Sequence, residues 1–439
     1  MKRTLAVSSA LLSAALLAGC APRVGQAPAP TTEQLVRAAV ASQGVTDWSL
    51  TVTQSGAVTA TGKLGGRKFA ARFPGNWNGS ALLFAHGYVV PGQPEFDPET
   101  DFLASAYYGG VVNAPLSQGY AVAASAYDKT GYAVKSGIES TYRLKQFLDS
   151  VGAKRAYIAG ASMGGDITVG LIEQHPNDFE GALPFCGVVA GWREEQRYLA
   201  DFRVIYDFFT KNTAYKLPGA GNALTPRADF TQQAVQNSVG ALFTAASRNK
   251  AGPEARIIGL VSRFSGAQAD PISFITALSG NAYGLRDQLA TAGGNGYSNV
   301  GKIYSYRGAD PGVVAALNAG VERLTASPQA TAYLNANYTP TGKFTARVLS
   351  FHNLVDPLVP YEFEPIYKAI VAKAGNGANL VQQVVDPKPV NYADLRDSGP
   401  AHCYFSAPEL TTAWNELRGW VENGVRPQEG KNITDKPTQ

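Results

Sequence analysis

The sequence predicts an α/β protein that has a mostly parallel sheet, helices on both faces of the sheet and one large helical insertion. From "ALLFAHGY" (81–88) onward, apolar segments that suit strands alternate with amphipathic segments that suit helices. This alternation is typical of parallel sheets whose crossover helices cover both faces. It stops after Cys186 for roughly 158 residues, from 187 to 344. Because a crossover unit takes about 30 residues, the longer stretch indicates an inserted domain.

The core elements follow from the period of the apolar residues. Period-two alternation near the N-terminus predicts antiparallel strands at the leading edge of the sheet, and apolar runs further along predict buried parallel strands. Ser406 and Glu409 would form a capping box for the last helix, which Gly424 would end. In chain order, we expect a helix over 32–44, strands over 48–54, 57–64, 67–74, 81–85 and 119–127, a helix over 134–152, strands over 155–159, 181–189, 346–356 and 379–386, and a helix from 406.

The inserted segment is expected to be helical and to form a cap or lid. Asp270 and Asp310 are each followed by proline, which pairs an N-cap residue with proline at the first helical position. Residues 230–243 carry apolar side chains at helical spacing. The aromatic residues of 192–209 would line a pocket or form the core of the cap.

The first 20 residues have the pattern of a bacterial lipoprotein signal. Lys2 and Arg3 precede an apolar stretch of about thirteen residues, which is shorter than the roughly 20 needed to cross a bilayer. "LAGC" then ends in Cys20, which would carry lipid. The Ala- and Pro-rich segment 21–31 would act as a tether. We therefore expect an envelope protein, at the outer membrane or on a periplasmic or extracellular face, that meets the membrane only through this lipid.

The chain is therefore expected to divide into five parts, of which the core consists of two segments. They are the signal peptide 1–20, the tether 21–31, the core 32–187 and 345–427, the cap 188–344 and a flexible tail 428–439.

Composition indicates a globular body and argues against nucleic acid as a partner. Of 439 residues, 45% are hydrophobic and 16% are charged, which suits a large domain with an insertion. Without Lys2 and Arg3, the 38 basic residues fall to 36, against 34 acidic ones. A nearly neutral chain lacks the basic surface that nucleic acids require. No cluster of histidines and carboxylates has metal-ligand spacing, so we expect neither a metal nor a cofactor.

The segment "GASMGG", residues 160–165, has the form of a turn that exposes a nucleophilic serine. A short apolar strand precedes Ser162, a helix follows at once, and Gly160 and Gly164 lack the Cβ atoms that would clash across the turn. The helix dipole and the backbone N–H of Met163 would stabilise an oxyanion. The G-x-S-x-G pattern alone also arises by chance, so the prediction depends on the strand and the helix around it.

A serine nucleophile needs a base, and the chain has four histidines. His175 ends the helix that begins after Ser162, about 20 Å away. His86 opens a turn in which its backbone is expected to matter more than its ring, and His352 lies inside a strand. His402 lies in a loop between the last strand and the last helix, and is the best base by elimination and by position. A surface histidine without a chemical role is the alternative.

The acid that orients this base is expected to be Asp356. It follows an apolar strand and begins an Asp-Pro turn, which places a carboxylate at the carboxyl end of the sheet, where ligands bind in open α/β folds. Asp386, at the end of the next strand, is the alternative.

In these motifs and their order the chain resembles the α/β-hydrolase superfamily. The likeness covers about 82–187 and 347–424, and includes the HG turn, the serine turn, the D-x-x-V-P acid turn and a histidine after the last strand. The resemblance implies an α/β-hydrolase fold whose insertion lies where caps or lids lie in this superfamily. It also implies an oxyanion hole formed by the backbone N–H groups of Met163 and Tyr88.

One feature is similar to the tannases and feruloyl esterases of this superfamily, which have cysteines directly beside both the serine and the histidine. Cys403 follows His402 as in that pattern, but Ala161 precedes Ser162. The substrates of that subfamily are therefore not carried over to this chain.

The cysteines predict a disulfide near the serine. If Cys20 takes lipid, Cys186 and Cys403 remain as an even pair in an oxidising location. Cys186 ends a strand and Cys403 adjoins His402, so both are expected at the carboxyl edge of the sheet. We expect a Cys186–Cys403 bond that holds the base in register. Two unrelated buried thiols are the alternative.

The sequence thus predicts a cofactor-independent serine hydrolase that cleaves small carboxylic esters through an acyl-enzyme, with His402 deprotonating Ser162 and Asp356 holding the imidazolium. A capped peptidase is a second hypothesis, in which Glu194 and Glu195 bind a peptide amine; a solvated helix face is the alternative reading of these two residues. The third is a non-catalytic envelope binding protein, which predicts a broken triad.

Overall fold

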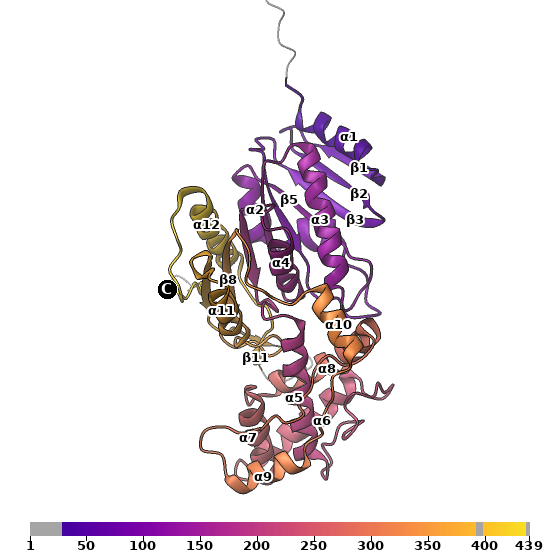
Figure 1. Cartoon of the computed structure of the whole chain (residues 1–439), viewed down its shortest axis with the longest axis vertical. Coiled ribbons are helices and arrows are strands. Elements are labelled where there is room, and N and C mark those ends of the chain that lie inside the picture. The colour runs from indigo at the N-terminus through magenta and orange to yellow at the C-terminus, as the bar shows by residue number, and fades with distance from the viewer. Residues whose placement is uncertain (1–28, 392–397, 436–439) are drawn as a thin grey trace, which may run out of the picture. The chain divides into compact units, whose positions relative to one another are not determined.

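The computed structural model describes residues 29–391 and 398–435 (Figure 1). The expected signal peptide with Cys20, most of the tether and the last four residues of the chain lie outside the described residues. From Thr32 onward the chain forms one unit. Among the described helices, none has both the length and the apolar character needed to cross a membrane.

A nine-stranded sheet in the order β1-β2-β3-β5-β4-β6-β7-β8-β9 forms the centre of this unit. Strands β1, β2, β3 and β5 pair antiparallel in that order, and β5, β4, β6, β7, β8 and β9 pair parallel. The predicted α/β class, with a mostly parallel sheet and an antiparallel leading edge, is confirmed. The strands are β1 Thr46–Val52, β2 Val58–Leu64, β3 Arg67–Phe73, β4 Ser80–Ala85, β5 Ala121–Ser125, β6 Arg155–Ala161, β7 Gly181–Phe185, β8 Arg347–Asn353 and β9 Leu380–Val385, with a separate pair β10 Pro389–Asn391 and β11 Ser398–Pro400.

Helices cover both faces of the sheet, so the central strands are apolar along their whole length. On β4, which is entirely buried, successive side chains alternate between two apolar clusters, as the pleat requires. Leu83 belongs to the cluster that contains Ile167 of α4. Phe84 belongs to the cluster that contains Val111 of α2 and Trp414 of α12. The covering helices are α1 Thr32–Ser42, α2 Gly109–Ser117, α3 Val134–Val151, α4 Met163–Gln174, α11 Phe363–Lys373 and α12 Ala407–Asn423.

Between β7 and β8 the chain forms a run of helices, here called the insertion (residues 186–346). The side chains of Asp270 and Asp310 cap α8 and α9 by accepting hydrogen bonds from Ser273 N and Val313 N, which confirms both predicted N-caps. The helices of the insertion are α5 Trp192–Thr210, α6 Gln232–Arg248, α7 Pro253–Ser265, α8 Pro271–Ala292, α9 Pro311–Gly320 and α10 Pro328–Asn337.

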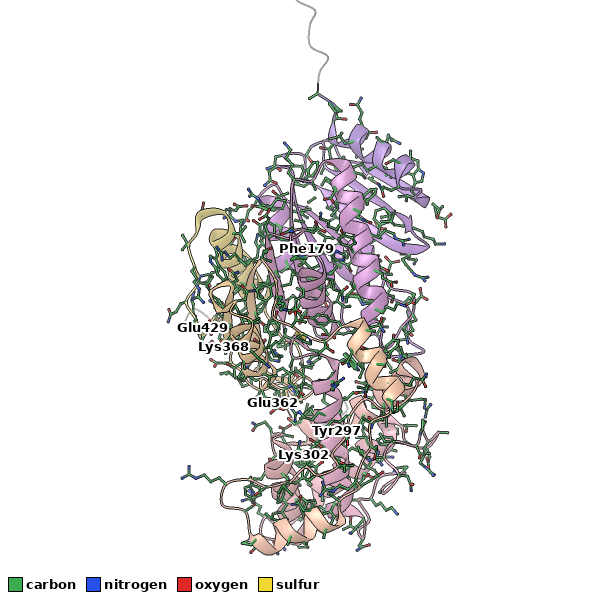
Figure 2. The ribbon with its side chains drawn as sticks, in the orientation of Figure 1. Phe179, Tyr297, Lys302, Glu362, Lys368 and Glu429 are labelled. Atoms are coloured by element: carbon green, nitrogen blue, oxygen red, sulfur yellow. A yellow bond between two sulfur atoms is a disulfide. The ribbon has the colours of Figure 1, made fainter. Side chains whose placement is uncertain are left out.

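A buried carboxylate organises the loop between α8 and α9. Asp201 of α5 accepts hydrogen bonds from the hydroxyls of Tyr297 (2.7 Å) and Tyr304, and forms an ion pair with Lys302. Figure 2 labels Tyr297 and Lys302 in the insertion. Because three partners share one carboxylate, the loop is fixed against α5.

The C-terminal segment agrees with the sequence analysis at α12 and differs after it. The capping box of Ser406 and Glu409 is present, and Gly424 ends the helix in the left-handed region (φ 71°). Residues 428–435, expected as flexible tail, instead run along β9: Val384 N bonds to Lys431 O (3.0 Å) and Ile433 N to Val384 O (2.9 Å). The expectation was wrong here because β9 is an edge strand whose backbone groups need partners.

Candidate active site

Ser162 lies on the sharp turn between β6 and α4. Its backbone (φ 57°, ψ −122°) is in a region that residues other than glycine rarely adopt. A Cβ on Gly160 would collide with the Gly164 carbonyl, and a Cβ on Gly164 would collide with the Ala85 carbonyl. The two glycines therefore allow the strand, the turn and the helix to approach closely, and the turn exposes the serine side chain to a cavity.

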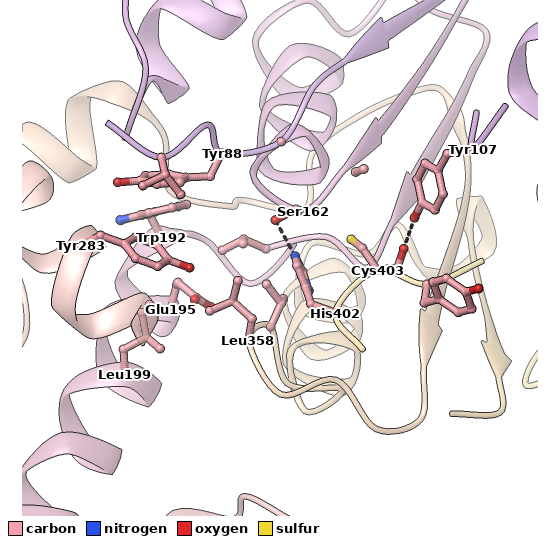
Figure 3. Close-up of a pocket in the computed structure, with 18 of the residues that line it drawn as sticks. Tyr88, Tyr107, Ser162, Trp192, Glu195, Leu199, Tyr283, Leu358, His402 and Cys403 are labelled. Atoms are coloured by element: carbon pink, nitrogen blue, oxygen red, sulfur yellow. Dashed lines mark hydrogen bonds between the residues drawn. The ribbon is translucent and has the colours of Figure 1, made fainter. Parts of the chain in front are cut away.

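Ser162, His402 and Asp356 form an unbroken chain of hydrogen bonds. His402 Nε2 lies 2.9 Å from Ser162 Oγ, and His402 Nδ1 lies 2.8 Å from Asp356 Oδ2. Figure 3 shows His402 directed at Ser162 on the floor of the cavity. The sequence analysis named these three residues, and the structure brings them together from the turn after β6, the loop before α12 and the turn after β8.

The strand order and the strand–serine–helix turn define the architecture. The chain has the α/β-hydrolase fold. In α/β-hydrolases the serine, the acid and the histidine follow one another along the chain, and here Ser162, Asp356 and His402 do so at the carboxyl ends of parallel strands. The fold that the resemblance implied is confirmed.

No protein-family model and no curated protein sequence matches the chain. Solved structures similar to this chain include feruloyl esterase B from Aspergillus oryzae, with 14% identity over 84% of this chain and 81% of that chain and a TM-score of 0.47. An esterase from Aspergillus oryzae has 15% identity over 84% and 80%, with a TM-score of 0.43.

Lipase A from Candida antarctica is similar at 14% identity over 90% of this chain and 86% of that chain, with a TM-score of 0.43. The fold assignment rests on the strand order and the turn geometry described above. The activities named for these similar structures belong to those proteins.

Asp356 is held as an anion by several donors. Besides His402, its oxygens accept hydrogen bonds from the backbone N–H groups of Leu358 and Val359, both at 2.9 Å, and of Cys403 at 3.2 Å. Burial raises the pKa of Asp356, but His402, His352 and the N–H group of Val359 outweigh burial and hold that pKa below its usual range. The alternative acid, Asp386, instead accepts a hydrogen bond from Asn432 at 2.8 Å.

A second polar layer, which the sequence analysis missed, lies behind Asp356. The ring of His352 is fully buried, with Nε2 at 2.8 Å from Val359 O and Nδ1 at 3.4 Å from Glu364 Oε1. Glu364, also fully buried, accepts a hydrogen bond from Ser350 Oγ at 2.6 Å. The sequence signal was two polar residues, Ser350 and His352, within an apolar strand, but nothing local pointed to Glu364.

The ring of His86 contributes more than the sequence analysis expected. It lies between the rings of Phe96 and Tyr127, with centroids 4.1 and 3.7 Å away, and its Nδ1 bonds to Gly87 O at 2.8 Å. Burial lowers the pKa of His86 to about 3, so the ring is neutral. The ring therefore fixes the loop that carries Tyr88. His175, by contrast, stacks on Tyr142 at the far end of α4.

Two backbone N–H groups are available beside the serine. Met163 begins α4, and Tyr88 follows Gly87, where a Cβ would lie 3.3 Å from Ser162 Cβ. Within the described part of the chain, neither the Met163 amide nor the Tyr88 amide donates a hydrogen bond. Both amides are the ones that the family resemblance implied for an oxyanion hole.

Cys186 and Cys403 form a disulfide, with Cα atoms 5.2 Å apart, so the predicted bond is confirmed. Both residues have left-handed backbones, with φ of 42° and 57°. The carbonyl of Cys403 accepts a hydrogen bond from the hydroxyl of Tyr107 (Figure 3). The segment after His402 is therefore held by a covalent bond and by hydrogen bonds.

The serine opens into a mostly apolar cavity of about 410 Å³ between the core and the insertion. Trp192 and Leu199 of α5 line it, whereas Phe202 and Tyr206 of the same helix are buried in the apolar cluster. Across residues 29–391 and 398–435, no group of three or more His, Cys, Asp or Glu side chains is arranged to hold a metal. The aromatic residues that line the cavity are Tyr88, Tyr107, Tyr108, Trp192, Tyr283 and Tyr404.

The two glutamates singled out in the sequence have different environments. Glu194 is partly exposed and forms an ion pair with Arg197 at 2.6 Å, as a solvated helix face would. Glu195 is 4% exposed and lines the cavity. The first turn of α5 therefore directs the carboxyl group of Glu194 toward Arg197 and that of Glu195 toward the cavity.

Proposed function

We propose that this protein is a serine hydrolase that cleaves carboxylic esters of small molecules through an acyl-enzyme. The observation that supports it is the unbroken hydrogen-bond chain from Ser162 Oγ through His402 to Asp356 at the floor of a cavity. A cavity of about 410 Å³ is within the range of small-molecule sites. A non-catalytic binding protein would have no need of an intact chain.

The geometry supports the following sequence of steps. His402 Nε2 takes the proton of Ser162 Oγ as the oxygen attacks the ester carbonyl, and ionised Asp356 stabilises the imidazolium through Nδ1–H. The N–H groups of Met163 and Tyr88 stabilise the oxyanion of the tetrahedral intermediate. His402 then returns the proton to the leaving alcohol, which leaves an acyl group on Ser162. A water molecule, deprotonated by the same imidazole, then attacks the acyl carbonyl; the bond to Ser162 Oγ breaks, His402 returns the proton to that oxygen and the carboxylic acid leaves.

For the cellular location, we propose that the protein is a lipoprotein of the bacterial cell envelope. Lipid on Cys20 would tether the body to the envelope through segment 21–31, at the outer membrane or on a periplasmic or extracellular face. Radiolabelled palmitate should be incorporated into the wild-type chain in bacteria and should be absent from Cys20→Ala. Equal incorporation in both would refute the anchor.

A panel of p-nitrophenyl esters graded by acyl length tests the reaction class. We expect turnover by the wild type and a loss of at least about a thousandfold in kcat for Ser162→Ala. Ester turnover that does not depend on Ser162 would contradict the proposal.

A peptidase is the second candidate, because the Glu195 carboxyl in the cavity could hold a peptide amine. Aminoacyl and dipeptidyl anilides, assayed beside the esters, distinguish the two. The ester proposal expects kcat/KM to be higher on the esters, and faster anilide cleavage would favour the peptidase.

A further inference from the structure

Glu195 has a buried carboxyl group at the cavity wall, and its Oε2 has no hydrogen-bond partner among residues 29–391 and 398–435. Its side chain is 4% exposed, and Oε2 is inaccessible to solvent and without a hydrogen bond. Figure 3 shows Glu195 among Trp192, Tyr283 and Leu358. A buried carboxyl group that lacks a partner costs several kcal/mol at most sites, and a ligand that gave Glu195 a partner would recover this cost.

The surroundings of Glu195 are acidic rather than basic. Lysine and arginine are absent from the described residues that line the cavity. Asp166 of α4 is fully buried, and within the described residues neither of its carboxyl oxygens has a hydrogen bond. Asp166 and Asp356 both interact electrostatically with Glu195. The nearby cation, Arg197, is already paired with Glu194 and Glu362. Along the described lining, no lysine or arginine therefore opposes a positive charge at this wall.

Burial and these acidic neighbours act in the same direction on Glu195. Burial, followed by the charge of Asp356, raises the pKa of Glu195 well above its usual range, although the charge of Arg197 acts in the opposite direction. A cation beside the carboxyl group would reverse this effect, because an opposite charge favours the ionised form. An entering cation would therefore convert an unpaired acid into an ion pair.

Aromatic rings line the same end of the cavity (Figure 3). The rings of Tyr88 and Trp192 are nearly parallel (18°), with centroids 6.4 Å apart, and the centroids of Tyr88 and Tyr283 are 6.0 Å apart. The face of an aromatic ring is negative and attracts cations. On α8, a Cβ added to Gly284 would meet nothing within 4 Å, so this wall leaves room for a ligand.

On the basis of the proposed ester hydrolase activity, we propose that the wall formed by Tyr88, Trp192, Glu195 and Tyr283 binds an ammonium group of the substrate. The substrates would then be esters that carry a positively charged amine in the acyl or the alcohol part. Glu195 would supply the counter-charge and the three rings would supply cation–π contacts. A neutral substrate that uses only a hydroxyl on Glu195 is the competing possibility.

Matched ester pairs test this charge preference. One pair has the p-nitrophenyl ester of trimethylammonio-butanoate and its neutral isostere, in which carbon replaces nitrogen; the other has the acetate ester of choline and its carbon isostere. In one pair or the other, the wild type should prefer the cationic ester by about tenfold or more in kcat/KM. Ratios near one in both pairs would overturn the proposal.

Two variants of α5 locate the preference. Glu195→Gln keeps the shape and removes the charge, and should abolish most of the preference through a higher KM for the cationic ester. Glu194→Gln removes the neighbouring surface carboxyl and should retain the preference. An unchanged ratio in Glu195→Gln, with the melting temperature showing a folded variant, would overturn the proposal.

A binding measurement needs neither a variant nor turnover. Titration calorimetry with trimethylphenylammonium and with tert-butylbenzene should show tighter binding of the cation to the wild type. Equal binding would overturn the inference. If neither ester pair is cleaved while the cation still binds preferentially, the hydrolase proposal fails and the ammonium site stands. If the neutral esters are cleaved in a Ser162-dependent way without charge preference, the hydrolase proposal stands and the ammonium site is overturned.

Discussion

Cys403 is bonded through its sulfur to Cys186 and donates its backbone N–H to the carboxylate of Asp356, 3.2 Å away. One residue thus connects the end of β7, the acid and, through its neighbour His402, the base. Cys186 and Cys403 have left-handed backbones, and such conformations persist only where the surroundings enforce them. The disulfide is therefore a structural support for the geometry of His402 and Asp356.

Removal of the disulfide should weaken both activity and stability. In the double variant Cys186→Ala/Cys403→Ala we expect kcat to fall about tenfold, because the His402 loop is less well positioned. The free energy of unfolding should fall by about 2–5 kcal/mol, because the bond closes a long loop. Turnover and urea unfolding measure the two effects. Full activity under strong reductant, with the disulfide shown to be open, would contradict this role.

Asp356→Asn should lower kcat by about a thousandfold to ten-thousandfold while the protein stays folded, because an amide cannot stabilise the imidazolium. Asp386→Asn is the matched control, since this aspartate bonds to Asn432 and should change kcat less than about twofold. Steady-state kinetics on one p-nitrophenyl ester compares them. A larger effect at Asp386 would show that the acid was assigned wrongly.

Asp166→Asn should stabilise the protein increasingly as pH rises. Burial, and then Glu173, raises the pKa of Asp166 well above its usual range in the folded state. Between the unfolded pKa and this raised value, the unfolded chain ionises while the folded chain does not. The wild type therefore loses about 1.4 kcal/mol of stability per pH unit that the variant keeps. Urea unfolding between about pH 5 and pH 7 measures this, and a constant difference between the two proteins would refute it.

The segment that follows α12 should contribute to stability. Ile433 is 7% exposed and its N–H bonds to Val384 O, so Ile433→Ala should lower the free energy of unfolding by about 2 kcal/mol. The exposed Val425 is the control, and Val425→Ala should change it by less than about 0.5 kcal/mol. Equal effects would show that the segment does not pack on β9.

Much of the candidate site could be predicted because its signals are local. Ser162 lies between glycines in a strand–turn–helix pattern, and Asp356 begins a turn directly after an apolar strand. His402 was identified because few histidines compete with it. These features depend on the chain within a few residues of each position.

The features that the sequence analysis missed depend on contacts between distant segments. Glu194 and Glu195 are adjacent, and only the packing of α5 against the core decides which of them lines the cavity. Glu364 acts through His352, which comes from another element. The pairing of the C-terminal segment with β9 likewise depends on which strand lies at the edge of the sheet, which no local pattern reveals.

The central claim is that Ser162 is the nucleophile of an acyl-enzyme, and labelling with a fluorophosphonate tests it most directly. Intact mass spectrometry should show one phosphonyl group on the wild-type protein, and peptide mapping should place it on Ser162. The reaction should disappear in Ser162→Ala and slow by at least about a hundredfold in His402→Ala, because the hydroxyl then lacks its base. Labelling of Ser162→Ala at the wild-type rate, or a wild-type adduct on another residue, would contradict the account.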